Sequence, residues 1–309
     1  MRSNKTRKIF ITGGAGFIGS YLSAALKALG DIIYIYDIRI NQRDDVRDRE
    51  RLQKALIKFR PQGVVHLAAV SRVEEGFQDP ERCIAVNIDG TANVLQNIAS
   101  LKTSKKPWFI FGGSREVFGN PQQFPVKESF PKTPTNIYAV TKVAGENLAS
   151  TYASNYGLQA RTIRFSGVYT GLEDRLQRVI PRFLIAALQG QPLIVEGGQQ
   201  FFDFVHINDS VQGILKCMEH VEQTTMPYED FNLATGKSIT VQDLARLIIE
   251  LTKSKSKLKV VEPRFYDVKG FTGDPKKAKE QLGWRATVDL EAGLQSVIPS
   301  FQKAYTRKS

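Results

Sequence analysis

The sequence predicts an α/β protein with a doubly wound parallel sheet of the Rossmann type and a smaller C-terminal lobe that binds substrate. Strands and helices alternate through the first half, the strands are nearly continuous apolar runs, and glycines join the first strand to the first helix. This pattern is typical of a parallel sheet covered on both faces by helices. We expect residues 1–168, with a return segment at about 203–235, to form the Rossmann domain. Residues 169–202 and 236–309 are expected to form the substrate-binding lobe.

The expected elements follow one another without an internal repeat. Gly30 and Gly157 can each adopt the left-handed conformation that closes a helix, and Pro61 cannot continue one. After residue 169 the regular order changes to a loop, a helix at 179–190 and a short strand. The strands expected before that point lie at 8–16, 31–38, 63–69, 107–114 and 158–169, and the helices at 17–30, 47–60, 84–101 and 138–157.

The composition is that of a globular protein. Hydrophobic residues make up 42% and charged residues 24% of the 309 positions, and no segment approaches the roughly 18 uninterrupted apolar residues of a membrane span. A short basic tail leads directly into the first strand, without the features of a secretory signal. We therefore expect a cytoplasmic protein that does not bind membranes, in which Cys83 and Cys217 are buried thiols.

The formal net charge of +12 raises the question of a polyanionic partner. The basic residues are spread over several segments, and no aromatic residues alternate with them to form a base-stacking platform. This distribution favours a solvated surface over a nucleic-acid site. His66, His206 and His220 are too scattered to predict a metal site, and we expect none.

The glycine-rich turn "TGGAGFIG" lies between the first strand and the first helix. Glycines allow a tight turn, so that a pyrophosphate can bind the N–H groups at the helix N-terminus. Asp37 ends the second strand, where a carboxylate can accept hydrogen bonds from an adenosine ribose and would repel a 2′-phosphate. This favours NAD over NADP, although Arg39 lies close by. The turn residues expected to bind the cofactor are Gly13, Gly16, Phe17, Ile18 and Gly19.

Tyr138 and Lys142 are four residues apart on an expected helix, so their side chains share one face. The adjacent ammonium and the positive nicotinamide of a bound cofactor favour the phenolate, and we expect them to lower the pKa of Tyr138 and make that side chain a proton acceptor. Ser114, at the end of an earlier strand, could hold the same substrate hydroxyl toward the tyrosine. The three residues predict a catalytic set for oxidation of an alcohol.

The chain resembles the extended short-chain dehydrogenase/reductases of the NAD-dependent nucleotide-sugar epimerase/dehydratase family over nearly its whole length. The matching segments are "TGGAGFIGS", "VVHLAA", "VNIDGTANVL", "SREVFG", "YAVTK", "RFSGVY", "FDFVHIND" and "DPKKAKEQLGW". The resemblance implies that Lys142 holds the nicotinamide ribose, and that the helices of residues 87–101 and 138–156 form a homodimer interface. It also implies cofactor contacts from Asp45, Val46, Leu67, Ala68 and Ala69.

The segment Ser114–Arg115–Glu116 bears on the type of reaction. By resemblance, Ser114 is the catalytic Ser/Thr, and Glu116 is at the position of a catalytic glutamate in sugar 4,6-dehydratases and glucuronate decarboxylases. Dehydratases that use an Asp-Glu pair place the aspartate where this chain has Arg115. Arg115 has three interpretations: a structural or solvent-facing arginine, a phosphate clamp, or a reader of a C6 carboxylate.

Two substitutions affect the expected substrate diphosphate site. Gly167 replaces the family's usual asparagine, and Phe202 replaces an arginine that usually binds the diphosphate. Arg264 matches the family's later phosphate-side arginine, and Arg115 or Arg178 could compensate for the loss.

The sequence thus favours an NAD-dependent nucleotide-sugar epimerase, acting at C4 through a transient 4-keto sugar. One alternative is a nucleotide-sugar 4,6-dehydratase or uronate decarboxylase that uses Glu116 as a base. The other alternative is a binding protein that has the same fold but catalyses no sugar reaction. The net charge of +12 and the altered diphosphate site are the observations that suggest it.

Overall fold

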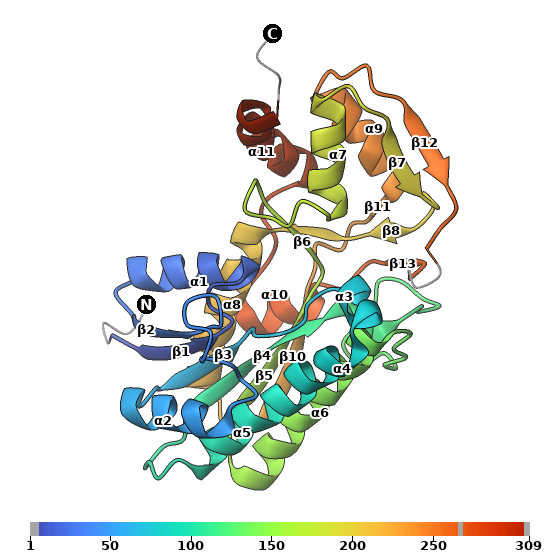
Figure 1. Ribbon diagram of the computed structural model, residues 1–309. Helices are drawn as coiled ribbons and strands as arrows, with labels where there is room; N and C mark the ends of the chain where they lie inside the picture. The colour runs from blue at the N-terminus through green and yellow to red at the C-terminus, as the bar shows by residue number, and fades with distance from the viewer. Residues whose placement is uncertain (1–5, 265–267, 306–309) are drawn as a thin grey trace.

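The computed structural model describes residues 6–264 and 268–305 and consists of two lobes (Figure 1). The larger lobe is built around a six-stranded sheet in which every pairing is parallel. In spatial order its strands are β10 (Tyr228–Leu233), β5 (Ala160–Phe165), β4 (Trp108–Ser114), β3 (Gly63–His66), β1 (Lys8–Thr12) and β2 (Ile32–Tyr36). The predicted parallel Rossmann sheet is therefore confirmed.

Helices cover both faces of this sheet, because its strands are apolar on both sides (Figure 1). One face carries α1 (Phe17–Ala28), α8 (Ile207–Gln223) and α10 (Lys276–Leu282). The other carries α2 (Arg49–Phe59), α5 (Gly90–Ser100) and α6 (Ile137–Tyr156). The return segment thus supplies α8 and the edge strand β10, while α10 packs on the same layer as α8.

The smaller lobe has its own apolar core between helices and short strands. Its helices are α7 (Val179–Leu188), α9 (Val241–Leu251) and α11 (Leu290–Tyr305). Two parallel strands, β7 (Leu193–Glu196) and β12 (Leu258–Val261), form its outer edge. A three-stranded sheet near the larger lobe comprises β8 (Phe201–Phe202), β11 (Ile239–Thr240) and β13 (Gly270–Phe271).

The structure corrects the expected strand at residues 158–169. The chain leaves the main sheet at Ser166, whose hydroxyl donates to the carbonyl of Asp203 at 2.6 Å. It then forms a separate strand, β6 (Gly167–Tyr169), which pairs in parallel with β9 (Phe204–His206). This departure carries the chain from the Rossmann sheet toward the smaller lobe.

The expected helix at 84–101 also differs from the structure. Helix α4 (Pro80–Ile84) continues through a π-helical turn (Ala85–Asp89) into α5. Within this turn the Asn87 side chain bonds to both backbone groups of Val70, at 2.8 and 3.0 Å, and to the Thr141 hydroxyl. The distorted turn therefore anchors the loop after β3, which leads into the short helix α3 (Val73–Gln78).

Within the described residues, no helix is both long and apolar enough to cross a membrane. Cys83 and Cys217 are buried free thiols, as expected.

Candidate active site

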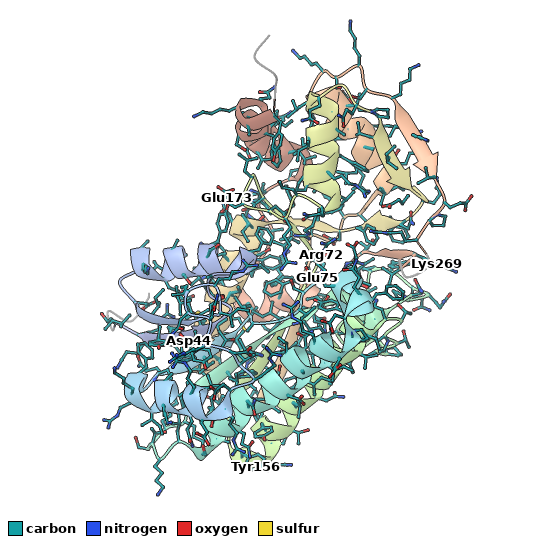
Figure 2. The ribbon with its side chains drawn as sticks, viewed as in Figure 1. Asp44, Arg72, Glu75, Tyr156, Glu173 and Lys269 are labelled. Atoms are coloured by element: carbon teal, nitrogen blue, oxygen red, sulfur yellow. The ribbon has the colours of Figure 1, made fainter. Side chains whose placement is uncertain are left out.

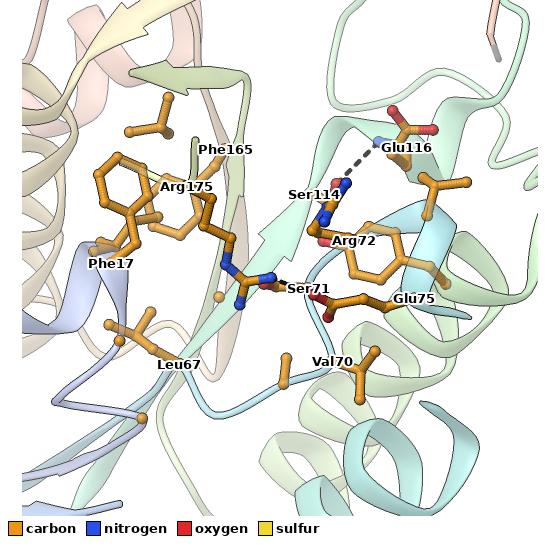
Figure 3. Close-up of a pocket in the computed structure, with 18 of the residues that line it drawn as sticks. Phe17, Leu67, Val70, Ser71, Arg72, Glu75, Ser114, Glu116, Phe165 and Arg175 are labelled. Carbon is orange, nitrogen blue, oxygen red and sulfur yellow. Dashed lines mark hydrogen bonds and ion pairs between the residues drawn. The ribbon is translucent and has the colours of Figure 1, made fainter. Parts of the chain in front are cut away.

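The loops at the carboxyl ends of the parallel strands and the facing side of the smaller lobe enclose a cavity of about 730 Å³. Ligands of open α/β sheets bind at this edge. Figure 2 shows Arg72 and Glu75 between the two lobes, and Figure 3 shows the lining of the pocket. The lining includes all the predicted site residues: Gly13, Gly16, Phe17, Ile18, Gly19, Asp37, Asp45, Val46, Leu67, Ala68, Ala69, Ser114, Arg115, Glu116, Tyr138, Lys142, Gly167, Arg178 and Arg264.

The turn between β1 and α1 has the geometry of a phosphate cradle. Gly13 adopts a φ of +70°, and a side chain at Gly19 would place its Cβ 2.2 Å from the Gly13 carbonyl oxygen. Gly16 caps α1 without a side chain, and the first turn of the helix contains no acidic residue. The N–H groups and the positive end of the helix dipole are therefore available to an anion. These features fit a dinucleotide pyrophosphate.

Asp37 is buried at the end of β2 and also supports this turn. One carboxylate oxygen accepts from the Ala15 N–H at 2.9 Å, and the other accepts from the Arg39 N–H at 2.8 Å. The Arg39 guanidinium donates to the Ala15 carbonyl, so it lies close to the position expected for the ribose. Each carboxylate oxygen retains a lone pair that could accept from a ribose hydroxyl.

Ser114 and Tyr138 meet at the end of β4, where both side chains are buried. A hydrogen bond from the Ser114 hydroxyl favours the phenolate of Tyr138, as does the charge of Arg115. Burial nevertheless raises the pKa of Tyr138 to about 12. Desolvation outweighs the Ser114 hydrogen bond and the Arg115 charge, so the protein's own residues do not give the lowered pKa expected from Lys142 together with a bound nicotinamide.

Lys142 lies one helical turn after Tyr138 and is also buried. Its Nζ donates to the Gly112 carbonyl at 2.8 Å and lies 5.8 Å from the centre of the Tyr138 ring. Burial lowers the pKa of Lys142 to about 8. The ammonium is thus held between the end of β4 and the tyrosine, where it can donate to a ligand in the cavity.

Arg115 and Glu116 form an ion pair on the wall of the cavity, with 2.8 Å between Nη2 and Oε1. The other oxygen of Glu116 accepts from the Asn136 side chain at 3.4 Å. The Arg115 guanidinium lies 4.4 Å from the centre of the Phe202 ring and 5.8 Å from that of Phe271. Both oxygens of Glu116 therefore have partners, and Arg115 is neither solvent-facing nor without contacts.

The smaller lobe adds further arginines to the cavity. Arg182 and Arg264 both approach the Glu196 carboxylate, at 3.0 and 3.8 Å. Arg178 pairs with Asp174 and lies over the ring of Phe17, at the phosphate turn. Gly167 and Phe202 offer no charge of their own, so these arginines are among the positive groups of the smaller lobe that face the cavity.

One ion pair that sequence reasoning missed joins the lobes across the cavity. Arg175, in the loop before α7, contacts Glu75 of α3, with 2.5 Å between Nη1 and Oε1 (Figure 3). The two residues are 100 positions apart, and neither belongs to a recognisable motif. Tyr21 of α1 also reaches this loop, through Thr170 and Glu173, each at 3.2 Å.

Comparisons with known proteins agree with this geometry. A family model described as GDP-mannose 4,6 dehydratase matches residues 37–297. The UDP-glucuronate 4-epimerase 4 of Arabidopsis thaliana is 29% identical, covering 98% of this chain and 77% of that protein.

Two solved structures have the same architecture. UDP-glucose 4-epimerase of Thermotoga maritima, solved with UDP-glucose, superposes with a TM-score of 0.88 and is 30% identical, covering 96% of this chain and 99% of that one. UDP-glucose 4-epimerase of Brucella ovis, solved with NAD, superposes with a TM-score of 0.86 and is 26% identical, with the same coverage of both chains. The chain therefore belongs to the extended short-chain dehydrogenase/reductases, in the family of NAD-dependent nucleotide-sugar epimerases and dehydratases.

Proposed function

We propose that this protein is an NAD-dependent nucleotide-sugar 4-epimerase. The observation that carries the proposal is the placement of Ser114, Tyr138 and Lys142 in the same cavity as the glycine turn. Its 4-epimerase relatives and solved neighbours support the same reaction.

In this mechanism the sugar C4 hydroxyl binds between Ser114 and Tyr138. Ser114 positions the hydroxyl, and Tyr138 accepts its proton as the phenolate, the form that the charges of Lys142 and a bound nicotinamide would favour, while the C4 hydrogen leaves as hydride. NAD, when bound, would supply the acceptor and then the donor of the C4 hydride, so that C4 can be inverted through a 4-keto sugar. Lys142 contributes positive charge beside the phenol and would hold the nicotinamide ribose.

The remaining cavity residues have binding roles in this proposal. Gly13, Gly16 and Gly19 bind the pyrophosphate with the flanking Phe17 and Ile18, and Asp37 binds the adenosine ribose. Arg178 and Arg264, beside Gly167, bind the substrate diphosphate. The residues that would line the space for the adenine and the rest of the cofactor are Asp45, Val46, Leu67, Ala68 and Ala69.

Glu116 makes the dehydratase and decarboxylase alternatives testable. A base at C5 needs a carboxylate oxygen that reaches the sugar, and Glu116 lines the cavity with a lone pair left on each oxygen beyond its contact with Arg115 or Asn136. Mass spectrometry and proton NMR of nucleotide hexoses incubated with the protein and NAD separate the reactions. An unchanged mass with C4 inverted supports the epimerase; loss of water or carbon dioxide refutes it.

We also propose a cytoplasmic homodimer formed through α5 and α6. Residues on and beside α6 that expose apolar side chains include Ile84, Ile137, Val140 and Tyr156, and covering them would bury apolar surface. Light scattering should give twice the chain mass. The substitution Val140→Glu should reduce it to that of the monomer, and a monomeric wild-type protein would refute this assembly.

A further inference from the structure

We propose that Arg115 is a carboxylate-binding residue, so that the sugar of the substrate is a hexuronate with an acidic C6 group. This inference rests on the proposed 4-epimerase function, because that function places C4 of the sugar at Ser114 and Tyr138. It assigns to this site a substrate class that the catalytic set alone does not distinguish.

The position of Arg115 follows from that of Ser114. The two residues are adjacent, at the end of β4 and the start of the 3-10 turn Arg115–Phe118. A hexose whose C4 hydroxyl contacts Ser114 must place the substituents of the neighbouring ring atoms, C3 and C5, beside that residue. The group attached to C5 is C6, which is a hydroxymethyl in hexoses and a carboxylate in hexuronates.

The guanidinium of Arg115 is held in a fixed plane. The guanidinium lies over the Phe202 ring at 4.4 Å, and its Nη2 lies 2.8 Å from Oε1 of Glu116 in an ion pair. Arginine has five N–H donors in a planar fork. Glu116 is its only ion-pair or hydrogen-bond partner among the residues the structure describes, so the fork has donors left for a ligand in the cavity.

A carboxylate suits these remaining donors better than a hydroxymethyl group does. Its two oxygens are coplanar and match two parallel N–H groups of a guanidinium, whereas a hydroxymethyl offers one oxygen. If the ligand offers only that single acceptor, the other N–H groups of Arg115 lose their water when the sugar binds and gain no partner in return. This loss weakens binding. The stacked, anchored arginine is therefore preorganised for a planar anion.

Other arginines are better placed for the diphosphate. Arg182 and Arg264 share one carboxylate, Glu196, on the wall of the smaller lobe, and Arg178 lies beside Phe17. Arg115 is instead anchored on the larger lobe, next to the reacting hydroxyl. The carboxylate of Glu116 pairs with the Arg115 guanidinium and holds it beside Ser114.

The test compares UDP-glucuronate with UDP-glucose as substrates of the NAD-loaded enzyme. The wild type should have the higher kcat/KM for UDP-glucuronate. Arg115→Met should reduce this preference by roughly 10- to 150-fold, the effect of losing hydrogen bonds to a charged group. Arg115→Lys, which keeps the charge without the fork, should retain part of the preference. The control is Arg246→Met, which removes an exposed arginine paired with Asp243 and should leave the preference unchanged.

A second variant covers the possibility that Arg115→Met does not fold. Phe202→Leu retains the guanidinium and removes the aromatic face that fixes its plane, so it should lower the UDP-glucuronate preference without any change of charge. Circular dichroism establishes that each variant is folded before its kinetics are compared.

The outcomes separate this inference from the proposed function. Epimerisation of both substrates with equal kcat/KM, or an equal loss for both in Arg115→Met, would overturn the carboxylate assignment and leave the epimerase intact. If neither substrate is epimerised, the proposed function fails, and calorimetry decides the inference. Tighter binding of UDP-glucuronate that is lost in Arg115→Met supports it, and equal binding of the two sugars refutes it.

Discussion

Glu146 of the catalytic helix α6 forms a two-pronged ion pair with Arg164 of β5, with 2.9 Å for each contact, and neither side chain is exposed to solvent. Burial opposes the charge on Arg164, but Glu146 and Asp230 outweigh it and raise the pKa of the guanidinium. We expect Glu146→Gln to lower the free energy of unfolding by about 1.5–3 kcal/mol, because it removes one of the two carboxylates that pair with the buried guanidinium and leaves only Asp230. Urea unfolding measures the loss.

The control for this prediction is Glu280→Gln, which removes one member of an exposed pair 3.9 Å from Lys276. It should change stability by less than about 1 kcal/mol. Equal effects of the two substitutions would show that the buried pair contributes no more than a surface contact.

His66 should make the protein sensitive to acid. Burial and the charge of Lys142 lower the pKa of His66 to about 3 from its ordinary value of 6.5. Its Nε2 faces Thr91, whose hydroxyl already donates to Asn87, so Nε2 carries the hydrogen and Nδ1 accepts from Thr12. Between pH 6.5 and 3, His66 is protonated in the unfolded chain but neutral in the folded protein. The free energy of unfolding is therefore unaffected by His66 above pH 6.5 and decreases as the pH falls below that value.

The measurement is the free energy of unfolding at pH 7 and at pH 5, for the wild type and His66→Gln. The variant should be less stable at pH 7 but lose less stability on acidification. An identical pH dependence in the two proteins would exclude His66 as the group responsible.

The sequence predicts most of the large lobe because its structure depends on local signals. Apolar runs such as residues 107–114 define the strands, and Gly30 and Gly157 both adopt the positive φ that closes a helix. The departure of β6 from the main sheet is different, since it depends on the Ser166 contact with Asp203. A periodic pattern over residues 158–169 carries no information about a partner 37 positions away.

The candidate site also contains some features that the sequence predicts and others that only the structure shows. Its glycine turn and catalytic set can be found from the sequence because each lies within one motif. The Arg115–Phe202 contact and the Glu75–Arg175 pair arise only when the two lobes meet. Nor can spacing predict the burial that raises the pKa of Tyr138, because desolvation depends on everything packed around the phenol.

Gly19→Ala should abolish tight NAD binding. The new Cβ would lie 2.2 Å from the Gly13 carbonyl and 2.7 Å from the Gly14 Cα, so the phosphate turn would have to move. Gly157→Ala is the matched control: it introduces a side chain at a φ of +67° with no atom within 4 Å, far from the cofactor turn. That change should cost about 1–2 kcal/mol of stability and leave NAD affinity unchanged, as measured by calorimetry.

Tyr138→Phe should lower kcat by about 10²- to 10⁴-fold, the usual contribution of a positioned acid or base. The phenol is buried and hydrogen-bonded to Ser114, so its loss removes the proton acceptor while keeping the ring's packing. Tyr156→Phe is the matched control, since it makes the same change on the same helix at a side chain that is 54% exposed. Binding of NAD and of UDP-glucuronate should be similar in both variants. Full turnover by Tyr138→Phe would mean that another group takes the proton of the C4 hydroxyl, because phenylalanine has no oxygen to accept it.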